Sequence, residues 1–156
     1  MRDIEKLHFK IGLSGSSPIK QPQFSIGLDD QIFHSGFLTS GINDIEYFEF
    51  DAEISEGPHE LKIELLNKNS KDTIKDSSGN IESDLLLNID HIEIDEIDIA
   101  TLKWSESIYN PTYPPEYLDE EQKSITDVKN CVTLGWNGTW RLQFQSPFYL
   151  WLLEKF

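Results

Sequence analysis

Acidic and amide side chains gather in the polar stretch from residue 67 to residue 84. Asp72, Asp76, Asn80 and Asp84 all lie within it, and Ca²⁺ takes about six to eight oxygen ligands of this kind. Their spacing does not match the loop of an EF-hand. A calcium site is therefore one interpretation, beside the simpler one of a long exposed loop whose polar residues are solvated.

Aromatic side chains that can bind a ligand gather further along the chain. Tyr109, Tyr113 and Tyr117 stand among prolines, and Trp136 follows them. Prolines remove backbone donors, so we expect residues 109–117 to form an extended surface loop outside the sheet. Rings held there would offer a flat platform for stacking on a sugar or a protein partner, at a small cost in side-chain entropy. The alternative is that the tyrosines cover the end of the core.

Side chains for catalysis show no recognisable arrangement. The histidines His8, His34, His59 and His91 fall in different predicted strands or turns, without metal-ligand spacing. The sequence has no Gly-x-Ser-x-Gly motif, and Cys131, its single cysteine, lies in a strand pattern without an activating partner. The sequence therefore predicts a protein that is not an enzyme and needs no cofactor, apart from the calcium considered above.

Strands must position these groups, because apolar and charged residues alternate with a period of two between residues 45 and 99. Residues 48–54 and 61–65 each place apolar side chains on one face and charged ones on the other. Turn residues at 55–58 separate the two segments, which predicts an antiparallel hairpin with one dry and one wet face. The pattern is typical of an all-β domain.

A third alternating segment, residues 84–94, changes phase part-way. Its apolar residues shift from odd to even positions at Asp90, which predicts a β-bulge there. Asp95 and Glu96 follow at a place where a two-residue turn fits, although neither is the glycine that makes such turns easy.

The remaining segments extend the β pattern. Further strands are expected at residues 8–13, 24–28, 32–38 and 101–108. Asn137-Gly138 predicts a hairpin between residues 131–136 and 139–144, because both positions tolerate positive φ. Residues 118–129 are acidic and suit a short helix. The closing segment, residues 147–156 with Trp151, is either a final buried strand or a segment that docks on a partner.

Length and charge limit the classes of partner. The 156 residues suit one domain, residues 1–156, and the hydrophobic content of 38% is enough for a core. The net charge of −15 argues against nucleic acid, whose binding needs clustered Lys and Arg. Neither a signal peptide nor a stretch long enough for membrane insertion is present. We therefore expect a protein made in the cytoplasm.

Two sequence stretches support a resemblance to a known family. The pattern Gly57-Pro58-His59-Glu60-Leu61-Lys62-Ile63-Glu64-Leu65-Leu66-Asn67, followed by residues 84–92 from Asp84 to Ile92, resembles the core of carbohydrate-binding-module jelly rolls, especially calcium-dependent xylan-binding modules. The two stretches that carry this resemblance cover about a third of the chain. It implies a single antiparallel β-sandwich with long polar and Pro/Tyr-rich loops. Asn67 and Asp84 fall on motif positions, so they are the calcium ligands that the resemblance implies.

A second resemblance includes the C-terminus. Gly135-Trp136-Asn137-Gly138-Thr139-Trp140 together with residues 146–153 is similar to small β-sandwich proteins of marine tailed phages, several of which look like virion components. This resemblance implies a non-catalytic capsid decoration or tail-associated protein, located in the virion and bound to other virion proteins or to itself as a homo-oligomer. The alternative is a free-standing calcium-dependent glycan-binding module. The candidate residues for stacking on a glycan are Tyr109, Tyr113, Tyr117 and Trp136, and Trp151 lies in the C-terminal segment that can dock on a partner.

Overall fold

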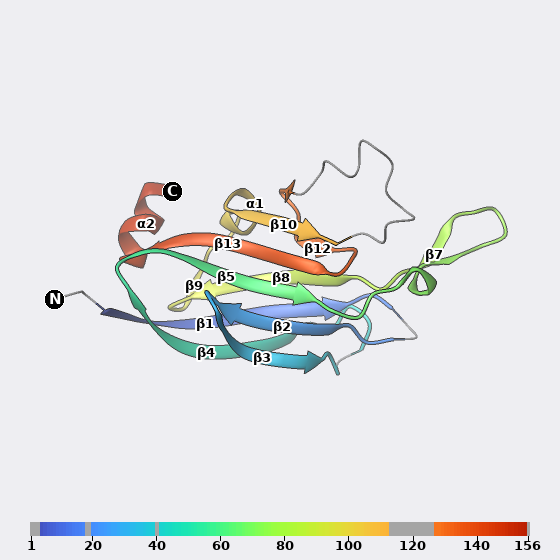
Figure 1. Ribbon diagram of the computed structural model, residues 1–156, viewed down its shortest axis with the longest axis horizontal. Coiled ribbons are helices and arrows are strands. Elements are labelled where there is room, and N and C mark those ends of the chain that lie inside the picture. Colours follow the sequence, from blue (N-terminus) through green and yellow to red (C-terminus); the bar gives the residue numbers. More distant parts are fainter. Residues whose placement is uncertain (1–3, 18–19, 40, 113–126, 156) are drawn as a thin grey trace.

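The computed structural model describes residues 4–17, 20–39, 41–112 and 127–155, which form two antiparallel β-sheets packed face to face (Figure 1). The first sheet has the spatial order β12 (Thr133–Leu134), β8 (Leu87–Ile94), β1 (Ile4–Gly15) and β4 (Glu46–Ser55), with β9 (Ile97–Asp98) also paired to β8. The second sheet has the order β11 (Val128–Lys129), β10 (Ser107–Pro111), β13 (Gly138–Ser146), β5 (Gly57–Leu65), β2 (Gln23–Leu28) and β3 (Gln31–Phe37). The predicted all-β sandwich is confirmed.

Three smaller elements and a hairpin complete the described chain. A 3-10 helix, η1 (Ser70–Asp72), leads into the hairpin of β6 (Ile74–Lys75) and β7 (Ile81–Ser83), which projects from one end of the sandwich (Figure 1). The α-helices are α1 (Leu102–Ser105) and α2 (Phe148–Lys155), and α2 lies at the opposite end. No helix in the described part of the chain is long and apolar enough to cross a membrane.

The core lies between the sheets, as the alternation predicts. The buried side chains of the long strands include Leu7, Phe9 and Ile11 in β1 and Ile63 in β5, all fully shielded from solvent. Trp140 of β13 is fully buried too, and its indole nitrogen donates to the carbonyl of Cys131. Burying one large apolar side chain contributes about 1.5 to 3 kcal/mol, so these alternating positions carry most of the stability.

The irregularities predicted around residues 90 and 95 are confirmed. In the pairing of β1 with β8, Gly12 lies opposite His91 and Leu13 opposite Ile89, so Asp90 is the extra residue of a bulge. Asp95 and Glu96 join β8 to β9 with φ values of 53° and 66°. The left-handed conformation of Asp95 is compensated locally, because its carboxylate accepts the backbone N–H of His8 at 2.8 Å.

The predicted hairpin of residues 48–65 is wrong. β4 pairs with β1 in the first sheet, whereas β5 pairs with β13 and β2 in the second. Glu56 and Gly57, with a φ of 116° at Gly57, carry the chain from one sheet to the other. Both strands bury their apolar face in the same core, and alternation alone does not say from which side.

The predicted hairpin at Asn137-Gly138 is also wrong. β12 belongs to the first sheet and β13 to the second. The Asn137 side chain instead bridges the backbone of Lys68, accepting its N–H at 2.7 Å and donating to its carbonyl at 2.9 Å. Gly138 has a φ of 151°, and a Cβ there would overlap the carbonyl oxygen of Asn110. The two residues are therefore needed for a crossing between sheets.

The segment expected as a strand at residues 101–108 divides into α1 and the start of β10. Tyr109 and Pro111 were expected in a loop, but they belong to β10 and pair with β13. Pro111 is tolerated because β11 pairs only with Ile108 and Tyr109 on the other side of β10, so its missing N–H interrupts no ladder.

The closing segment is a helix, which corrects the expectation of a final buried strand. In α2, Phe148 and Trp151 are buried on Phe144 of β13. Apolar residues on a short helix that caps a sheet follow the three- to four-residue period of the buried face, and a ten-residue stretch is too short to display that period clearly. The helix expected at residues 118–129 is wrong at its end, where Val128–Lys129 form β11 paired with β10; positions 118–126 lie outside the described residues.

Candidate functional site

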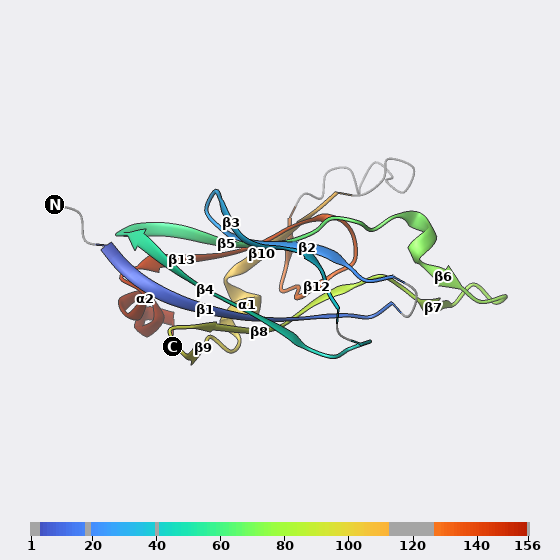
Figure 2. The same cartoon turned by 90° about the horizontal axis from the view of Figure 1, so that it is seen from below.

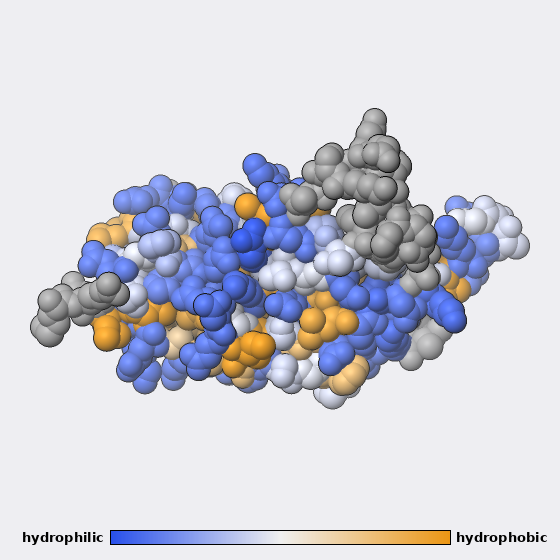
Figure 3. Space-filling model, viewed as in Figure 1, coloured by the Kyte–Doolittle hydropathy of each residue, from blue (hydrophilic) through white to orange (hydrophobic). Residues whose placement is uncertain are grey.

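A polar groove of about 530 Å³ crosses the outer face of the second sheet. Glu60 of β5 and Gln143 of β13 form its floor, His59 lies at one side, and α2 contributes Trp151 and Lys155. The β2–β3 turn at residues 29–30 and the residue after α1, Glu106, complete the lining. Figure 3 looks onto this face of the molecule, which is mainly hydrophilic with apolar patches. We call this feature the polar groove.

His59 is held as a cation at one side of the polar groove. Its Nε2 lies 2.6 Å from the carbonyl oxygen of Ser55, which can only accept, and its Nδ1 lies 2.7 Å from a carboxylate oxygen of Asp29. Both ring nitrogens therefore donate. Burial lowers the pKa of His59, but the hydrogen bonds to Asp29 and Ser55 outweigh it, and the pKa is raised above its ordinary value.

Glu60 is the fixed hydrogen-bonding centre of the floor. Its carboxylate accepts from Arg141 at 3.1 Å and from Gln143 at 3.3 Å, while its backbone N–H donates to Asp29 at 2.9 Å. Such cross-links hold the groups before a ligand arrives, which lowers the entropy cost of binding. Donors and acceptors are thus arranged along one open surface, which suits a ligand rich in hydroxyl groups.

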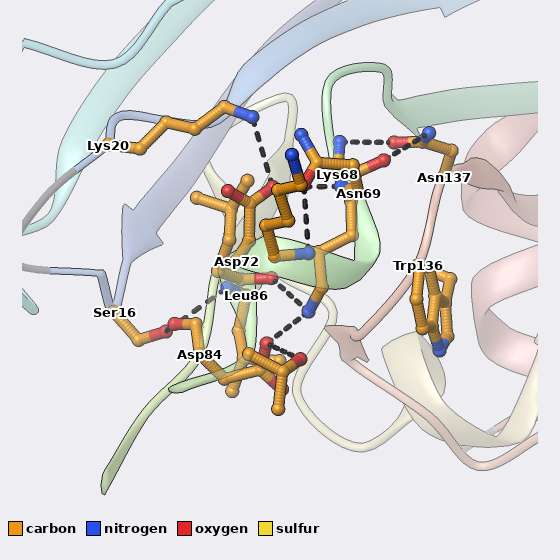
Figure 4. A network of polar contacts seen from close by, with 12 residues as sticks. Ser16, Lys20, Lys68, Asn69, Asp72, Asp84, Leu86, Trp136 and Asn137 are labelled. Atoms are coloured by element: carbon orange, nitrogen blue, oxygen red, sulfur yellow. Dashed lines mark hydrogen bonds and ion pairs between the residues drawn. The ribbon is translucent and has the colours of Figure 1, made fainter. Parts of the chain in front are cut away.

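A second polar cluster lies at the other end of the sandwich, around Lys68 (Figure 4). The Lys68 ammonium is buried, donates to the carboxylate of Asp84 and to the carbonyl of Leu85 at 3.0 Å, and lies 5.2 Å from the ring centre of Trp136. Thr73 donates to the same carboxylate oxygen at 2.8 Å. An internal cation therefore already neutralises the acidic group here.

The oxygen groups proposed as calcium ligands do not converge. Asn67 uses its side chain to bridge backbone groups of Gln23 and Gln21, at 2.8 and 3.0 Å, and Asp84 faces the Lys68 ammonium. Among the described residues, no group of three or more His, Cys, Asp or Glu side chains is placed to hold a metal ion. Asn67 and Asp84 as they stand do not fit a Ca²⁺ ion, which needs several convergent oxygens.

Two of the other three candidates for calcium, Asp72 and Asp76, also have separate partners. Asp72 pairs with Lys20 at 3.0 Å and accepts the backbone N–H of Asn69 at 2.8 Å. Asp76 closes the β6–β7 turn by accepting the N–H groups of Ser78 and Asn80. These side chains stabilise local turns, as the solvated-loop interpretation expects.

The aromatic candidates are scattered. Tyr109 is 4% exposed, and its hydroxyl contacts the backbone of Trp136, so its ring belongs to the core. Trp136 is half-buried beside the Lys68 ammonium. Trp151 is 6% exposed and borders the polar groove. Tyr113 and Tyr117 lie outside the described residues.

Of the residues that line the polar groove, Trp151 was among the candidate binding residues from the sequence, whereas its polar residues were not singled out. Glu60, Lys62 and Gln143 lie on the wet faces of alternating strands, as the pattern indicates, but the pairing of β5 with β13 brings together residues about eighty positions apart, such as Glu60 and Gln143. A period of two identifies a face without identifying its neighbour. No local signal could have located this groove.

Comparisons with known proteins bear on the fold. No family model and no curated protein matches the sequence. A structure of vCBM60 in complex with galactobiose is similar, with a TM-score of 0.50 and 12% identity over 88% of this chain and 97% of that chain. The chain has the fold of a carbohydrate-binding module. A selenomethionine form of vCBM60, described with two families of calcium-dependent carbohydrate-binding modules linked by circular permutation, gives a TM-score of 0.52 and 12% identity over 87% and 89% of the two chains.

The binding-module fold confirms the jelly-roll-like β-sandwich that the sequence predicts. At 12% identity, the likeness is one of fold. Binding of galactobiose and dependence on calcium are stated for those structures, and the site in this chain has to be argued from its own residues.

Proposed function

We propose that this protein is a non-catalytic glycan-binding protein and that its polar groove holds the glycan. The observation that carries the proposal is an open groove across a sheet of a carbohydrate-binding-module fold, lined by hydrogen-bonding side chains that are already fixed by one another. Sugars offer many hydroxyl groups in a rigid ring, and such ligands are bound by convergent polar groups beside an apolar surface. Trp151, 6% exposed, borders the groove with the edge of its ring and supplies the little apolar surface there.

Each group in the groove has a defined part in this proposal. Gln143 and Lys155 would donate to sugar hydroxyls, and Glu60 would accept from them. Lys155 lies 3.1 Å from Glu106, so binding would exchange part of one exposed ion pair for hydrogen bonds to the ligand. Exposed pairs are worth about 0 to 1 kcal/mol, so this exchange is inexpensive.

A matched pair of variants tests the groove. Lys155→Ala and Gln143→Ala should each weaken binding of the best glycan from an array about tenfold, the loss of one to two hydrogen bonds. Lys75→Ala is the control, because Lys75 is an exposed lysine on β6, at the opposite end of the molecule from α2 (Figure 2). Isothermal titration calorimetry on the full chain gives the dissociation constants. Equal affinities for all four proteins would contradict the proposed location.

Trp136 tests the alternative place for a glycan. It belongs to the second cluster, beside Lys68, and stacking of a sugar there would make Trp136→Ala the variant that loses binding. We expect this variant to bind glycan as the wild type does. Absence of binding to every glycan on the array, with and without calcium, would contradict glycan binding itself.

A second proposed role is attachment to a phage particle, in the virion, with other virion proteins or further copies of this chain as partners. α2 supports it, because Tyr149, Leu150 and Leu153 are exposed on its outer side, at 48%, 59% and 73%. An apolar helix face of this kind suits a protein contact. Quantitative mass spectrometry of purified particles tests the role, and absence of the protein at stoichiometric levels would contradict it.

A further inference from the structure

The sandwich is open between the end strands of its two sheets. β4 ends the first sheet and β3 ends the second, and a hollow of about 700 Å³ lies between them, bordered by residues 51–55 of β4 and by Gln31 and Phe33 of β3. Figure 2 looks at this side and shows β3 and β4 as separate strands there. We call this hollow the edge groove.

The two end strands contact each other beside the middle of β4. The rings of Phe33 and Phe50 stack 4.3 Å apart, and His34 Nε2 lies 2.8 Å from the carbonyl oxygen of Glu49. That carbonyl therefore points away from β1, toward the open edge of the first sheet. Backbone groups of alternate residues in a strand point the same way, so Asp51 and Glu53 also direct N–H and C=O toward the edge groove. Among the described strands, β4 pairs only with β1, which leaves this edge open to another strand.

Along this open edge, the side chains of β4 are apolar on the core face of the sheet and acidic on its outer face. Ala52 and Ile54 turn toward the core and border the edge groove together with Phe33. Asp51 and Glu53 turn to the outer face, where both are exposed. A strand added here would meet an apolar surface with one set of alternate side chains and carboxylates with the other.

Carboxylates line the edge groove beside a smaller apolar surface, and the chain as a whole is acidic. Asp29, Asp30, Asp51 and Glu53 all border it. Each of these carboxylates has a cation nearby: His59 is bound to Asp29, Lys62 lies 3.9 Å from Asp30, His8 lies 2.7 Å from Asp51, and Lys6 lies opposite Glu53 in the β1–β4 pairing. With a chain charge of −15, a basic ligand is favoured at this edge and an acidic one is repelled.

We propose that the edge groove binds an extended, basic segment of a partner protein, which adds to β4 as a further strand. Its backbone would hydrogen-bond to Asp51 and Glu53, and its apolar side chains would cover Phe33, Ala52 and Ile54. Lys or Arg at the alternate positions would lie beside Asp51 and Glu53. Binding by strand addition takes its affinity from the backbone and its specificity from alternate side chains.

A second copy of the chain is disfavoured as the occupant. Pairing β4 with β4 would place Asp51 and Glu53 of one copy among the same carboxylates of the other, and like charges opposite one another across a ladder are destabilising. The edge groove adjoins the polar groove proposed for glycans and shares Asp29, Asp30 and His59 with it. The residues that each proposal tests are different, so each can fail without the other.

Peptide binding tests strand addition directly. The probe is a fluorescent peptide of alternating Lys and Val, seven residues long, titrated with the full chain at physiological salt. Two further peptides carry N-methyl groups on all Lys amides or on all Val amides, so each loses the hydrogen-bond donors of one edge. We expect one methylated peptide to lose at least about tenfold in affinity and the other to bind like the parent, because only one edge of an added strand faces β4. No saturable binding of the parent peptide, or equal affinities of the two methylated peptides, would overturn the proposal.

A charge-reversal pair locates the binding. Glu53→Lys should weaken peptide binding about tenfold, whereas Glu82→Lys on β7 makes the same change in net charge at a distant exposed site and should change it less than about twofold. Both positions are exposed, and circular dichroism checks that both variants fold. Equal effects of the two substitutions would overturn the proposal, as would a wild-type dimer in sedimentation that Glu53→Lys dissociates, since the edge groove would then hold a second copy.

Discussion

The Lys68 ammonium lies against the Asp84 carboxylate at the end of the sandwich where the β6–β7 hairpin begins. The Lys68 side chain is 1% exposed and that of Asp84 21% exposed, so the ion pair joins the end of β5 to the segment before β8 with little access of water. Breaking a buried pair by removing one partner leaves a charge without compensation. The pair therefore holds the loops of this end in place.

Replacing Lys68 by Met tests this role. Lys68→Met should lower the free energy of unfolding by about 3 kcal/mol, near the lower end for a broken buried pair because water can still reach Asp84. Urea denaturation followed by tryptophan fluorescence measures the change. Lys71→Met is the matched control, because Lys71 is exposed in the same loop, and it should stay within about 0.5 kcal/mol of the wild type. Similar losses in both variants would contradict a specific role for Lys68.

Calcium addition tests whether Asp84 is a metal ligand. The Lys68 ammonium already occupies its carboxylate, so any shift in melting temperature that CaCl₂ causes should be the same in the wild type and in Asp84→Asn. A ligand that binds the folded protein raises its melting temperature, and a variant that lacks the binding site loses this increase. Thermal melts in CaCl₂ and in EDTA give the comparison. An increase in melting temperature with CaCl₂ that is present in the wild type and lost in Asp84→Asn would show that Asp84 binds calcium.

Trp151 should be a stability residue as well as a wall of the polar groove. Its ring packs on Phe144 and Phe148, with centroids 6.2 and 5.9 Å away. Trp151→Ala should therefore cost about 3 to 5 kcal/mol of unfolding free energy. Leu153→Ala on the same helix is the control, because Leu153 is 73% exposed, and it should have little effect. Unchanged stability of Trp151→Ala would show that α2 does not close the core.

His59 predicts a pH dependence of stability. Its pKa is raised in the folded protein, so its contribution is complete below the unfolded value of about 6.5 and is lost as the pH rises through the folded value. The free energy of unfolding should fall from pH 6 toward pH 8, and it should fall less in His59→Gln. Urea titrations at several pH values measure the slope.

His8 contributes in the same direction, which gives a second measurement. Hydrogen bonds to Glu49 and then Asp51 raise its pKa, so His8→Gln should flatten the slope further when combined with His59→Gln. His8 is more exposed, with 38% of its side chain accessible, and solvent screening makes its share smaller. Identical slopes in the wild type and the double variant would contradict both assignments.

The sequence predicts the layers of this fold better than their connections. Alternation in β1, β4, β5 and β8 identifies the buried faces, and the phase change at Asp90 locates the bulge, because both depend only on local side-chain direction. The pairing of β5 with β13 depends on contacts between residues far apart in the chain. The polar groove, which is built on that pairing, could not be predicted for the same reason.

Asn137-Gly138 shows how a correct local signal led to a wrong connection. The dipeptide was expected in a tight turn because it tolerates positive φ, and Gly138 does have a φ of 151°. Its neighbours, however, enter different sheets, and Asn137 binds the backbone of Lys68. A residue that tolerates positive φ suits a hairpin turn, but it also suits a connection that crosses from one sheet to the other. The dipeptide alone does not distinguish the two.

Gly138→Ala tests this explanation against simple backbone strain. A Cβ at Gly138 would overlap the Asn110 carbonyl oxygen and come within 2.8 Å of the Pro111 Cα, so the substitution should push β10 from β13 and cost more than about 3 kcal/mol, beyond the range for an unfavourable φ alone. Gly79→Ala is the control, with a φ of 85° and no atom within 4 Å of the added Cβ; it should cost about 1 kcal/mol. Urea denaturation of both variants gives the difference. Equal losses of unfolding free energy in the two variants would contradict a role for the close approach of the β10 backbone. Glycine would then be needed at position 138 only for its φ.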